Sequence, residues 1–206
     1  MTDINARSAP AKARGRPREF DINTALDRAA EVFSERGFHA TSIVDLTTAM
    51  GLASGSVYKA FKDKQSVFTA AFDHQQAARL EKLRRVVSHD KSARDIIHCV
   101  LTHYADLSHG AEGKRGCMLV GSAATLTTFE SEVAQRVTAS LRNLETLLAN
   151  LIRVGQKDGS IRKNLDSDAV ARLMLCIAQG MRVIGKTGRT RAQMREAADA
   201  AMGLLD

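Results

Sequence analysis

The sequence predicts an all-α fold, and three observations carry that prediction. Apolar residues recur at three- and four-residue spacing through most of the chain, as they do along one face of a helix. No stretch alternates β-branched and polar residues in the manner of a half-buried strand. Both prolines, Pro10 and Pro17, lie in the first 20 residues, so neither interrupts a later helix. We therefore expect helices and short loops throughout the chain after residue 20.

Composition limits the class of protein. Hydrophobic residues make up 44% of the 206 residues and charged residues 26%, a balance typical of globular proteins. No apolar run approaches the ~20 residues that a membrane span needs, and the N-terminus lacks the apolar core of a secretory signal. The three cysteines lack disulfide-framework spacing, which fits a reducing compartment. We expect a cytoplasmic protein that contacts no membrane.

Positive charge gathers at the N-terminus. The formal net charge is +7, and no acidic residue lies between Asp3 and Glu19. This stretch is poor in large apolar groups, which predicts a flexible basic arm over residues 1–20. Its charge permits an anionic partner such as DNA without requiring one. The cations are Arg7, Lys12, Arg14, Arg16 and Arg18.

Two predicted helices follow the arm. Asp21 is expected to cap a first helix that ends near Arg36, and Gly37 lies where a left-handed residue ends a helix. The second helix starts at Thr41 or Ser42. Ser42 and the aspartate three residues later have the spacing of a capping box.

A glycine turn and a third helix complete the pattern. Gly51 ends the second helix, and a short helix follows over about residues 54–61. Its Val57 and Phe61 are four apart and can dock on the first two helices. Two short helices around a glycine turn, each with one apolar stripe, are typical of a helix-turn-helix. The expected divisions are an arm over 1–20, a helix-turn-helix DNA-binding domain over 21–66, and a regulatory and dimerisation domain over 67–206.

The stretch of residues 33–68 resembles the DNA-binding signature of the TetR family, and the similarity covers about 50 residues when the first helix is included. The matching elements are Arg36-Gly37-Phe38, Thr41-Ser42-Ile43, Asp45-Leu46, Gly51-Leu52, Gly55-Ser56-Val57-Tyr58 and Phe61-Lys62-Asp63-Lys64. The resemblance implies about nine helices, the last of them forming a ligand-binding and dimerisation domain. It also implies a repressor that a small-molecule signal releases from a palindromic operator. Activation in place of repression stays open, because a fold does not fix the regulatory sign.

The third helix is expected to enter the major groove of DNA. Lys59 is the candidate base reader, because a lysine can donate to N7 and O6 of guanine. Tyr58 matches a family position that contacts the phosphate backbone, and Gly55 lets the helix approach closely. The other candidates are Ser54 and Ser56 for phosphates or base edges, and Thr41, Ser42 and Lys64 for phosphates at helix starts.

Alternatives stay open at several of these positions. Ser42 could serve only as a cap, and Lys64 could lie on a solvated face. Two positions depart from the family pattern. Ala53 stands where a capping serine is common, so the helix start is expected to rely on Ser54. Ala60 stands where an aromatic residue or a histidine is common, which removes one possible contact.

The arm carries a second signal. Arg14-Gly15-Arg16-Pro17 resembles the core of an AT-hook. The narrow, negative minor groove of A·T-rich DNA can take an extended pair of arginines, which makes Arg14 and Arg16 candidate contacts. The alternative is a solubilising tail.

The regulatory half is predicted to consist of helices over about 64–89, 92–109, 117–128, 131–157, 167–187 and 190–204. In the TetR family two C-terminal helices pair with their symmetry mates, so the resemblance implies a homodimer through about residues 167–204. Small and apolar residues of the last helix would take part, and an intramolecular core is the alternative. These residues are Ala197, Ala198, Ala201, Leu204 and Leu205.

The sequence does not identify the effector, but several residues are candidates for lining its binding site. Beyond Phe72 the chain has two Phe or Tyr residues, Tyr104 and Phe129, and no tryptophan, which offers few platforms for planar aromatic drugs. Met118, Met174 and Met181 could line an adaptable pocket or simply pack in the core.

Cys117 is a candidate sensor. It follows Lys114-Arg115 and is expected to open a helix, and both features favour the thiolate. The Gly-Cys pair resembles a TetR subgroup in which some members sense electrophiles or oxidants. Lys186 could reach the same region. The alternative for Cys117 is a small packing residue.

Two other classes of protein are an enzyme and a metal-responsive regulator. The glycines near residue 113 make no phosphate loop, because no strand precedes them and no Gly-Lys-Ser/Thr follows. With no catalytic triad or carboxylate pair in view, neither an enzyme nor a cofactor is expected. A metal-responsive regulator is the alternative, since Cys99 and His103 are four apart with His98 adjacent. Two ligands are a weak signal, and no metal site is assigned.

Overall fold

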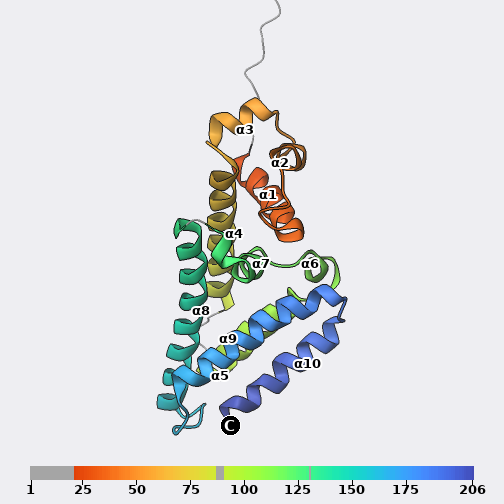
Figure 1. The fold of residues 1–206 in the computed structure, drawn as a ribbon. Helices are drawn as coiled ribbons and strands as arrows, with labels where there is room; N and C mark the ends of the chain where they lie inside the picture. The colour runs from red at the N-terminus through yellow and green to blue at the C-terminus, as the bar shows by residue number, and fades with distance from the viewer. Residues whose placement is uncertain (1–20, 87–90, 130) are drawn as a thin grey trace, which may run out of the picture.

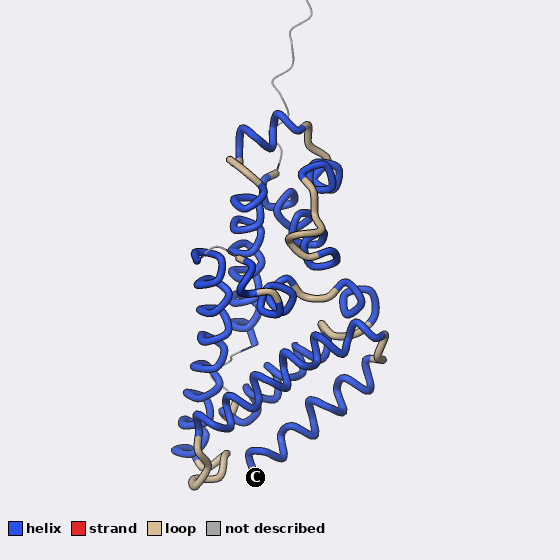
Figure 2. The backbone as a smooth tube through the Cα atoms, in the orientation of Figure 1, coloured by secondary structure: helices blue, strands red, loops and turns tan. Residues whose placement is uncertain are grey.

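The computed structural model describes residues 21–86, 91–129 and 131–206, and every regular element in those ranges is a helix (Figures 1 and 2). The all-α prediction is confirmed. The elements are α1 (Ile22–Arg36), α2 (Ile43–Met50), α3 (Ser54–Ala60), α4 (Lys64–Val86), α5 (Ala93–Asp106), α6 (Gly110–Arg115), α7 (Met118–Ala124), η1 (Leu126–Thr128), α8 (Ser131–Asp158), α9 (Ser167–Ile184), η2 (Gly185–Thr187), α10 (Arg191–Ala201) and η3 (Met202–Leu205).

The helix ends of α1 and α2 follow the local sequence. The Asp21 carboxylate accepts from the Asn23 amide at 3.0 Å and caps α1. Ser42 and Asp45 form the expected capping box, in which the Asp45 amide donates to Ser42 Oγ at 3.1 Å. Gly51 ends α2 at φ +66°, a left-handed conformation that glycine adopts without strain. The predicted caps and the left-handed Gly51 are confirmed, whereas Gly37 ends α1 at φ +77° and ψ 169°, a positive-φ conformation outside the predicted αL region.

The start of α3 differs from the prediction. Ala53 occupies the N-cap position in an extended conformation and makes no side-chain cap, while Ser54 is already the first helical residue. Ser54 therefore does not cap this helix, because a capping side chain must precede the first turn.

The N-terminal helices share an aromatic core with the regulatory half. Phe33 lies against Phe68 of α4 at 5.0 Å between ring centroids, and Phe38 lies 5.2 Å from Phe68. Phe129, which precedes α8, lies 5.3 Å from Phe38. The turn between α1 and α2 is thus packed directly on the regulatory half, and a shift in one must be accommodated by the other.

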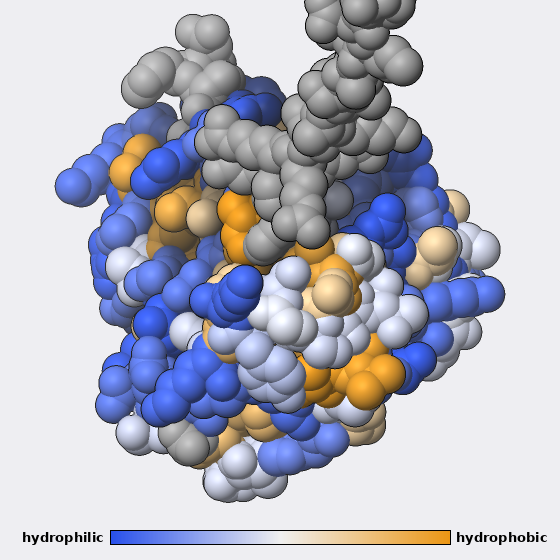
Figure 3. Space-filling view, turned by 90° about the horizontal axis from the view of Figure 1, so that it is seen from above, coloured by the Kyte–Doolittle hydropathy of each residue, from blue (hydrophilic) through white to orange (hydrophobic). Residues whose placement is uncertain are grey.

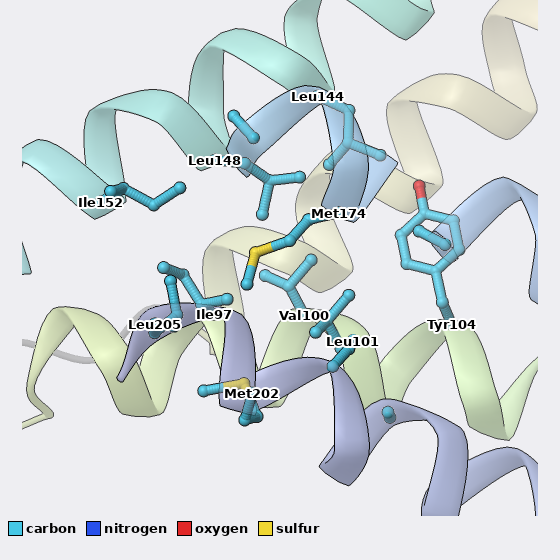
Figure 4. Close-up of a cluster of buried hydrophobic side chains, with 14 of the residues drawn as sticks. Ile97, Val100, Leu101, Tyr104, Leu144, Leu148, Ile152, Met174, Met202 and Leu205 are labelled. Carbon is cyan, nitrogen blue, oxygen red and sulfur yellow. The ribbon is translucent and has the colours of Figure 1, made fainter. Parts of the chain in front are cut away.

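A second core fills the regulatory half. Figure 4 shows Met174 of α9 between the side chains of α5, α8 and η3. α9 packs on both α8 and α5, and α10 packs on α5 (Figure 1). The labelled members are Ile97, Val100, Leu101, Tyr104, Leu144, Leu148, Ile152, Met174, Met202 and Leu205.

This packing uses one side of α10 within the single chain. Ala198, Ala201 and Leu205 are buried inside a single chain, and Leu204 packs against the same core. The two alanines let α10 approach α5 closely, so these buried residues cannot also pair with a second copy, whereas Ala197 on the opposite side of α10 is exposed. The large apolar residues of the regulatory half that are exposed lie on α4, α8 and α9: Leu80, Val154, Leu173, Val183 and Ile184.

Among the described residues, no helix is both long enough and apolar enough to cross a membrane.

Candidate DNA-binding surface and effector cavity

α3 has one inward residue and one outward face. Val57 is 1% exposed and anchors the helix on α1 and α2, whereas Tyr58 is 56% exposed. Ser54, Gly55 and Lys59 are also exposed, and positions one and four apart bring them onto the same side as Tyr58. α3 lies at the end of the molecule farthest from α10 (Figure 1). No described residue covers this face, so it can meet a partner.

The composition of that face suits a polar partner. A Cβ added at Gly55 would meet no atom within 4 Å, so nothing inside the chain requires glycine there. Ser56 is half-buried beside the exposed face. Seen from this end, the surface that the grey residues leave uncovered carries many hydrophilic side chains (Figure 3). The helix can therefore approach a polyanion without burying a large apolar patch.

Three predicted phosphate contacts differ in their availability. Ser42 is exposed, but its hydroxyl is engaged with Asp45. Thr41 is 2% exposed and its hydroxyl donates to the Gly37 carbonyl at 2.7 Å, so this side chain faces inward. Thr41 closes the turn after α1, and its assignment as a phosphate ligand is corrected on that geometry.

Lys64 also points inward. Its Nζ donates to the carbonyl oxygens of Phe38 and Thr41, each at 2.9 Å, and lies 4.4 Å from the centroid of the Phe38 ring. The ammonium thus holds the α1–α2 turn to the start of α4. A lysine committed to two carbonyls and a ring is a structural tether, which corrects its assignment to phosphate. Arg14 and Arg16 lie outside the described residues.

Cys117 lies where the two halves meet. It is 4% exposed at the N-terminus of α7, and the guanidinium of Arg79 donates to its sulfur at 3.4 Å. Burial raises the pKa of the thiol, but the charges of Arg79 and Arg182 outweigh burial and lower the pKa of Cys117 to about 7. The thiolate is therefore well populated near neutral pH.

The cations that act on Cys117 are not the predicted ones. Arg115 pairs with Glu31 at 3.1 Å and Glu35 at 3.7 Å, which ties α6 to α1. The predicted direction of the effect on the thiol holds, but its origin is tertiary. Arg79 and Arg182 were not singled out from sequence, although an arginine at position 182 interrupts the apolar residues of α9 and could have signalled a buried charge.

Lys186 lies near Cys117 in space. Its side chain passes over Gly116, close to where a Cβ at that position would stand. Gly116 has φ +93°, so it is glycine both for its conformation and for this close approach.

The other effector candidates are spread over two environments. Tyr104 is buried and lines an apolar groove of about 280 Å³ with Leu80, Leu83 and Leu144. Met118, Met174 and Met181 are each under 5% exposed and line neither this groove nor the cavity beside Cys117. Their assignment to an effector site is corrected, because they fill the two hydrophobic cores.

The cavity beside Cys117 is polar. It measures about 360 Å³ and is walled by α1, α4, α6 and α9 together with His103 of α5. Several buried nitrogen atoms on its wall have no hydrogen-bond partner: Nη1 of Arg79, Nε and Nη1 of Arg182, and Nε2 of His103. Burial and then the charge of Arg79 lower the pKa of His103, so its ring is neutral near pH 7.

The geometry gives little support to the alternative of a metal-responsive regulator. His98 Nε2 donates to the Asp199 carboxylate at 2.6 Å, and Cys99 Sγ accepts from Lys91 at 3.2 Å. Within the described part of the chain, no group of three potential ligands is assembled.

Two short helices around a left-handed glycine, presenting an exposed polar recognition face, define a DNA-binding protein of the helix-turn-helix class. The sequence model of the bacterial regulatory proteins of the TetR family matches residues 25–71, and that of the tetracycline-repressor-like C-terminal domain matches residues 93–201. The chain belongs to the TetR family.

Relatives cover nearly the whole chain. The transcriptional repressor ComR of Escherichia coli is 26% identical over 196 residues, 94% of this chain and 92% of its own. The regulator YezE of Bacillus subtilis is 26% identical, over 93% of this chain and 100% of its own. A cysteine mutant of the TetR-family regulator CifR, solved with a 26-base-pair operator, superposes with a TM-score of 0.81 at 28% identity, over 93% of this chain and 100% of its own. The chain is a DNA-binding transcriptional regulator and not an enzyme.

Proposed function

We propose that the protein is a homodimeric repressor that binds a palindromic operator and is released by a small-molecule or electrophile signal. The outward face of α3, with Tyr58 and Lys59 exposed, is the observation that carries the proposal. In this proposal Lys59 and Ser56 contact base edges, while Ser54, Gly55, Tyr58 and Ser42 approach phosphates. Residues 21–66 form the DNA-binding domain, residues 67–206 the regulatory domain, and the protein acts in the cytoplasm.

The proposed dimer face is formed by α8 and α9. Leu173, Val183 and Ile184 of α9 are 44–50% exposed, and Val154 of α8 is 52% exposed. On α9 these positions recur at ten and eleven residues, which is one side of a helix. A second copy of the chain would cover this stripe and set the two α3 helices on successive turns of the duplex.

Selection from a random duplex library tests the function. The full chain is expected to enrich an inverted repeat whose half-sites are about one helical turn apart. Enrichment of no sequence, or of a single unrepeated site, would contradict the proposal.

The basic arm is proposed as a minor-groove contact through Arg14 and Arg16. Deleting residues 1–18 is expected to weaken operator binding without lowering the melting temperature, because the segment is poor in the large apolar residues that a hydrophobic core needs. The salt dependence of binding should fall as phosphate contacts are lost. Unchanged affinity at physiological salt would show that the arm is a solubilising tail.

Cys117 is proposed as one route of release. Its thiolate is favoured by two guanidinium groups, and a covalent adduct on this buried atom would disturb the contact between α1 and α7. Treatment with a quinone is expected to release operator DNA from the wild-type protein but not from Cys117→Ser. The exposed Cys176 provides a control, since Cys176→Ser should respond like the wild type. Equal release from all three proteins would contradict this route.

A further inference from the structure

The polar cavity beside Cys117 contains cationic groups that the chain leaves without partners. Arg182 is 3% exposed, and its Nη2 donates a hydrogen bond to the Gly116 carbonyl at 2.8 Å. Arg79 donates a hydrogen bond to the Cys117 sulfur and lies 5.7 Å from the centroid of the Tyr104 ring. Within the described ranges, Nε and Nη1 of Arg182 and Nη1 of Arg79 have no hydrogen-bond partner. Among the described residues, neither arginine forms an ion pair with a carboxylate. Leaving buried donors unsatisfied is unfavourable, and more so for charged groups.

We propose that this cavity binds a small organic carboxylate, held by the guanidinium groups of Arg79 and Arg182, as an effector of the regulator. The inference rests on the proposed function, because it names the ligand class for the release of DNA. A carboxylate accepts charge-assisted hydrogen bonds from guanidinium groups, and the donors available to it are Nε and Nη1 of Arg182 and Nη1 of Arg79. The neutral ring of His103 adds one further polar contact.

The charges on the cavity wall favour a singly charged ligand. Four cationic side chains line the cavity, against three carboxylates, which leaves one positive charge in excess. A single carboxylate offsets that excess, whereas the second charge of a phosphate dianion would face uncompensated acids. Besides the two arginines, the charged residues on the wall are Asp27, Glu31, Lys82, Glu112 and Arg115.

The Cys117 thiolate and the ligand compete for the same cations. When the Cys117 thiol is ionised, its negative charge offsets the excess positive charge of Arg79 and Arg182. Carboxylate binding should therefore weaken as pH rises through the pKa of Cys117, and bound carboxylate should in turn raise that pKa, since linkage is reciprocal. Burial and the charge of Arg79 lower the pKa of His103, so its ring titrates on the acid side of Cys117, and burial raises the pKa of Tyr104, so its hydroxyl stays neutral.

The location of the cavity explains how occupancy would reach DNA. Asp27, Glu31 and Ser34 belong to α1 of the DNA-binding domain, whereas Arg79 and Arg182 belong to α4 and α9. A ligand that draws the two arginines together changes the position of α1 relative to α4 and α9. Release follows if that arrangement binds the ligand more tightly than the DNA-bound arrangement does.

Calorimetric titration of the full chain, without DNA, tests the proposal. Sodium butyrate is the probe, with butyramide as its neutral isostere and sodium phosphate as the dianion control. We expect one butyrate per chain, with butyramide and phosphate each at least tenfold weaker. Arg182→Gln and Arg79→Gln should each weaken butyrate at least tenfold, while Arg142→Gln, an exposed change on α8, should have no effect. Folding is checked by thermal melts, and if Arg182→Gln does not fold, Arg79→Gln and Arg79→Lys decide.

The pH series gives a second readout. Butyrate affinity of the wild type should fall severalfold between pH 6 and pH 8.5, and that of Cys117→Ser should stay constant. Equal binding of butyramide, tighter binding of phosphate, unaffected arginine variants or a flat wild-type profile would each overturn the proposal. Operator binding is measured separately without butyrate. Loss of butyrate binding with normal operator binding overturns this inference alone, whereas failure to bind any operator overturns the proposed function.

Discussion

Replacing Lys64 with methionine is expected to lower the free energy of unfolding by about 2 kcal/mol, because two inward carbonyls lose their donor. The ammonium joins the carbonyls of Phe38 and Thr41 at 2.9 Å each, and methionine keeps only the apolar stem. Urea unfolding of the full chain measures the effect.

Lys62→Met is the matched control. Lys62 is exposed two residues earlier, and its loss should leave stability within about 0.5 kcal/mol of the wild type. If Lys64→Met instead keeps full stability and lowers the salt dependence of operator binding, Lys64 contacts phosphate and the tether interpretation is wrong.

Replacing Leu173 with glutamate is expected to dissociate the dimer and to weaken operator binding at least 100-fold. The change puts two like charges into the proposed apolar interface, where neither has a partner. A monomer also loses the gain from binding two half-sites at once. Sedimentation velocity reports the oligomeric state, and fluorescence anisotropy reports the affinity.

Ala197→Glu is the control for this variant. It adds the same charge to the exposed side of α10, which the sequence had included in the interface. We expect Ala197→Glu to remain dimeric. If it dissociates while Leu173→Glu does not, the interface lies on α10 and the assignment to α8 and α9 is wrong.

The helix-turn-helix could be predicted because its determinants are local. A cap such as Asp21, a box such as Ser42 with Asp45, and a left-handed Gly51 each involve residues within a few positions of one another. The outward face of α3 follows from the same periodicity once Val57 is placed inside. Those features are legible without any knowledge of tertiary structure.

The direction of single polar side chains could not be predicted in the same way. The sequence predicts that Lys64 and Thr41 bind phosphates, because lysine and threonine at the starts of helices commonly do so. Their inward turn depends on carbonyls of the preceding loop, which the sequence does not position. Likewise the cations beside Cys117 come from α4 and α9, 38 and 65 positions away, and only the folded chain brings them together.

The choice of helix for the dimer interface also could not be predicted from the sequence. Both α9 and α10 have a small or apolar side, and either could pair with a second copy. Burial of Ala198 and Leu205 against α5 leaves the stripe on α9 as the exposed one. Such competition between intramolecular and intermolecular packing is settled by the free energies of the two contacts, which helix periodicity does not report.

The claim that α3 reads bases through Lys59 is tested most directly on the selected operator. Affinities are measured for duplexes in which each conserved guanine is replaced in turn by 7-deazaguanine, which lacks the N7 acceptor. The wild type is expected to lose about 1–3 kcal/mol of binding free energy at one guanine in each half-site. Lys59→Ala should bind the operator more weakly and no longer distinguish that guanine. If Lys59→Ala shows the same guanine preference as the wild type, Lys59 does not read the base and the proposed recognition is wrong.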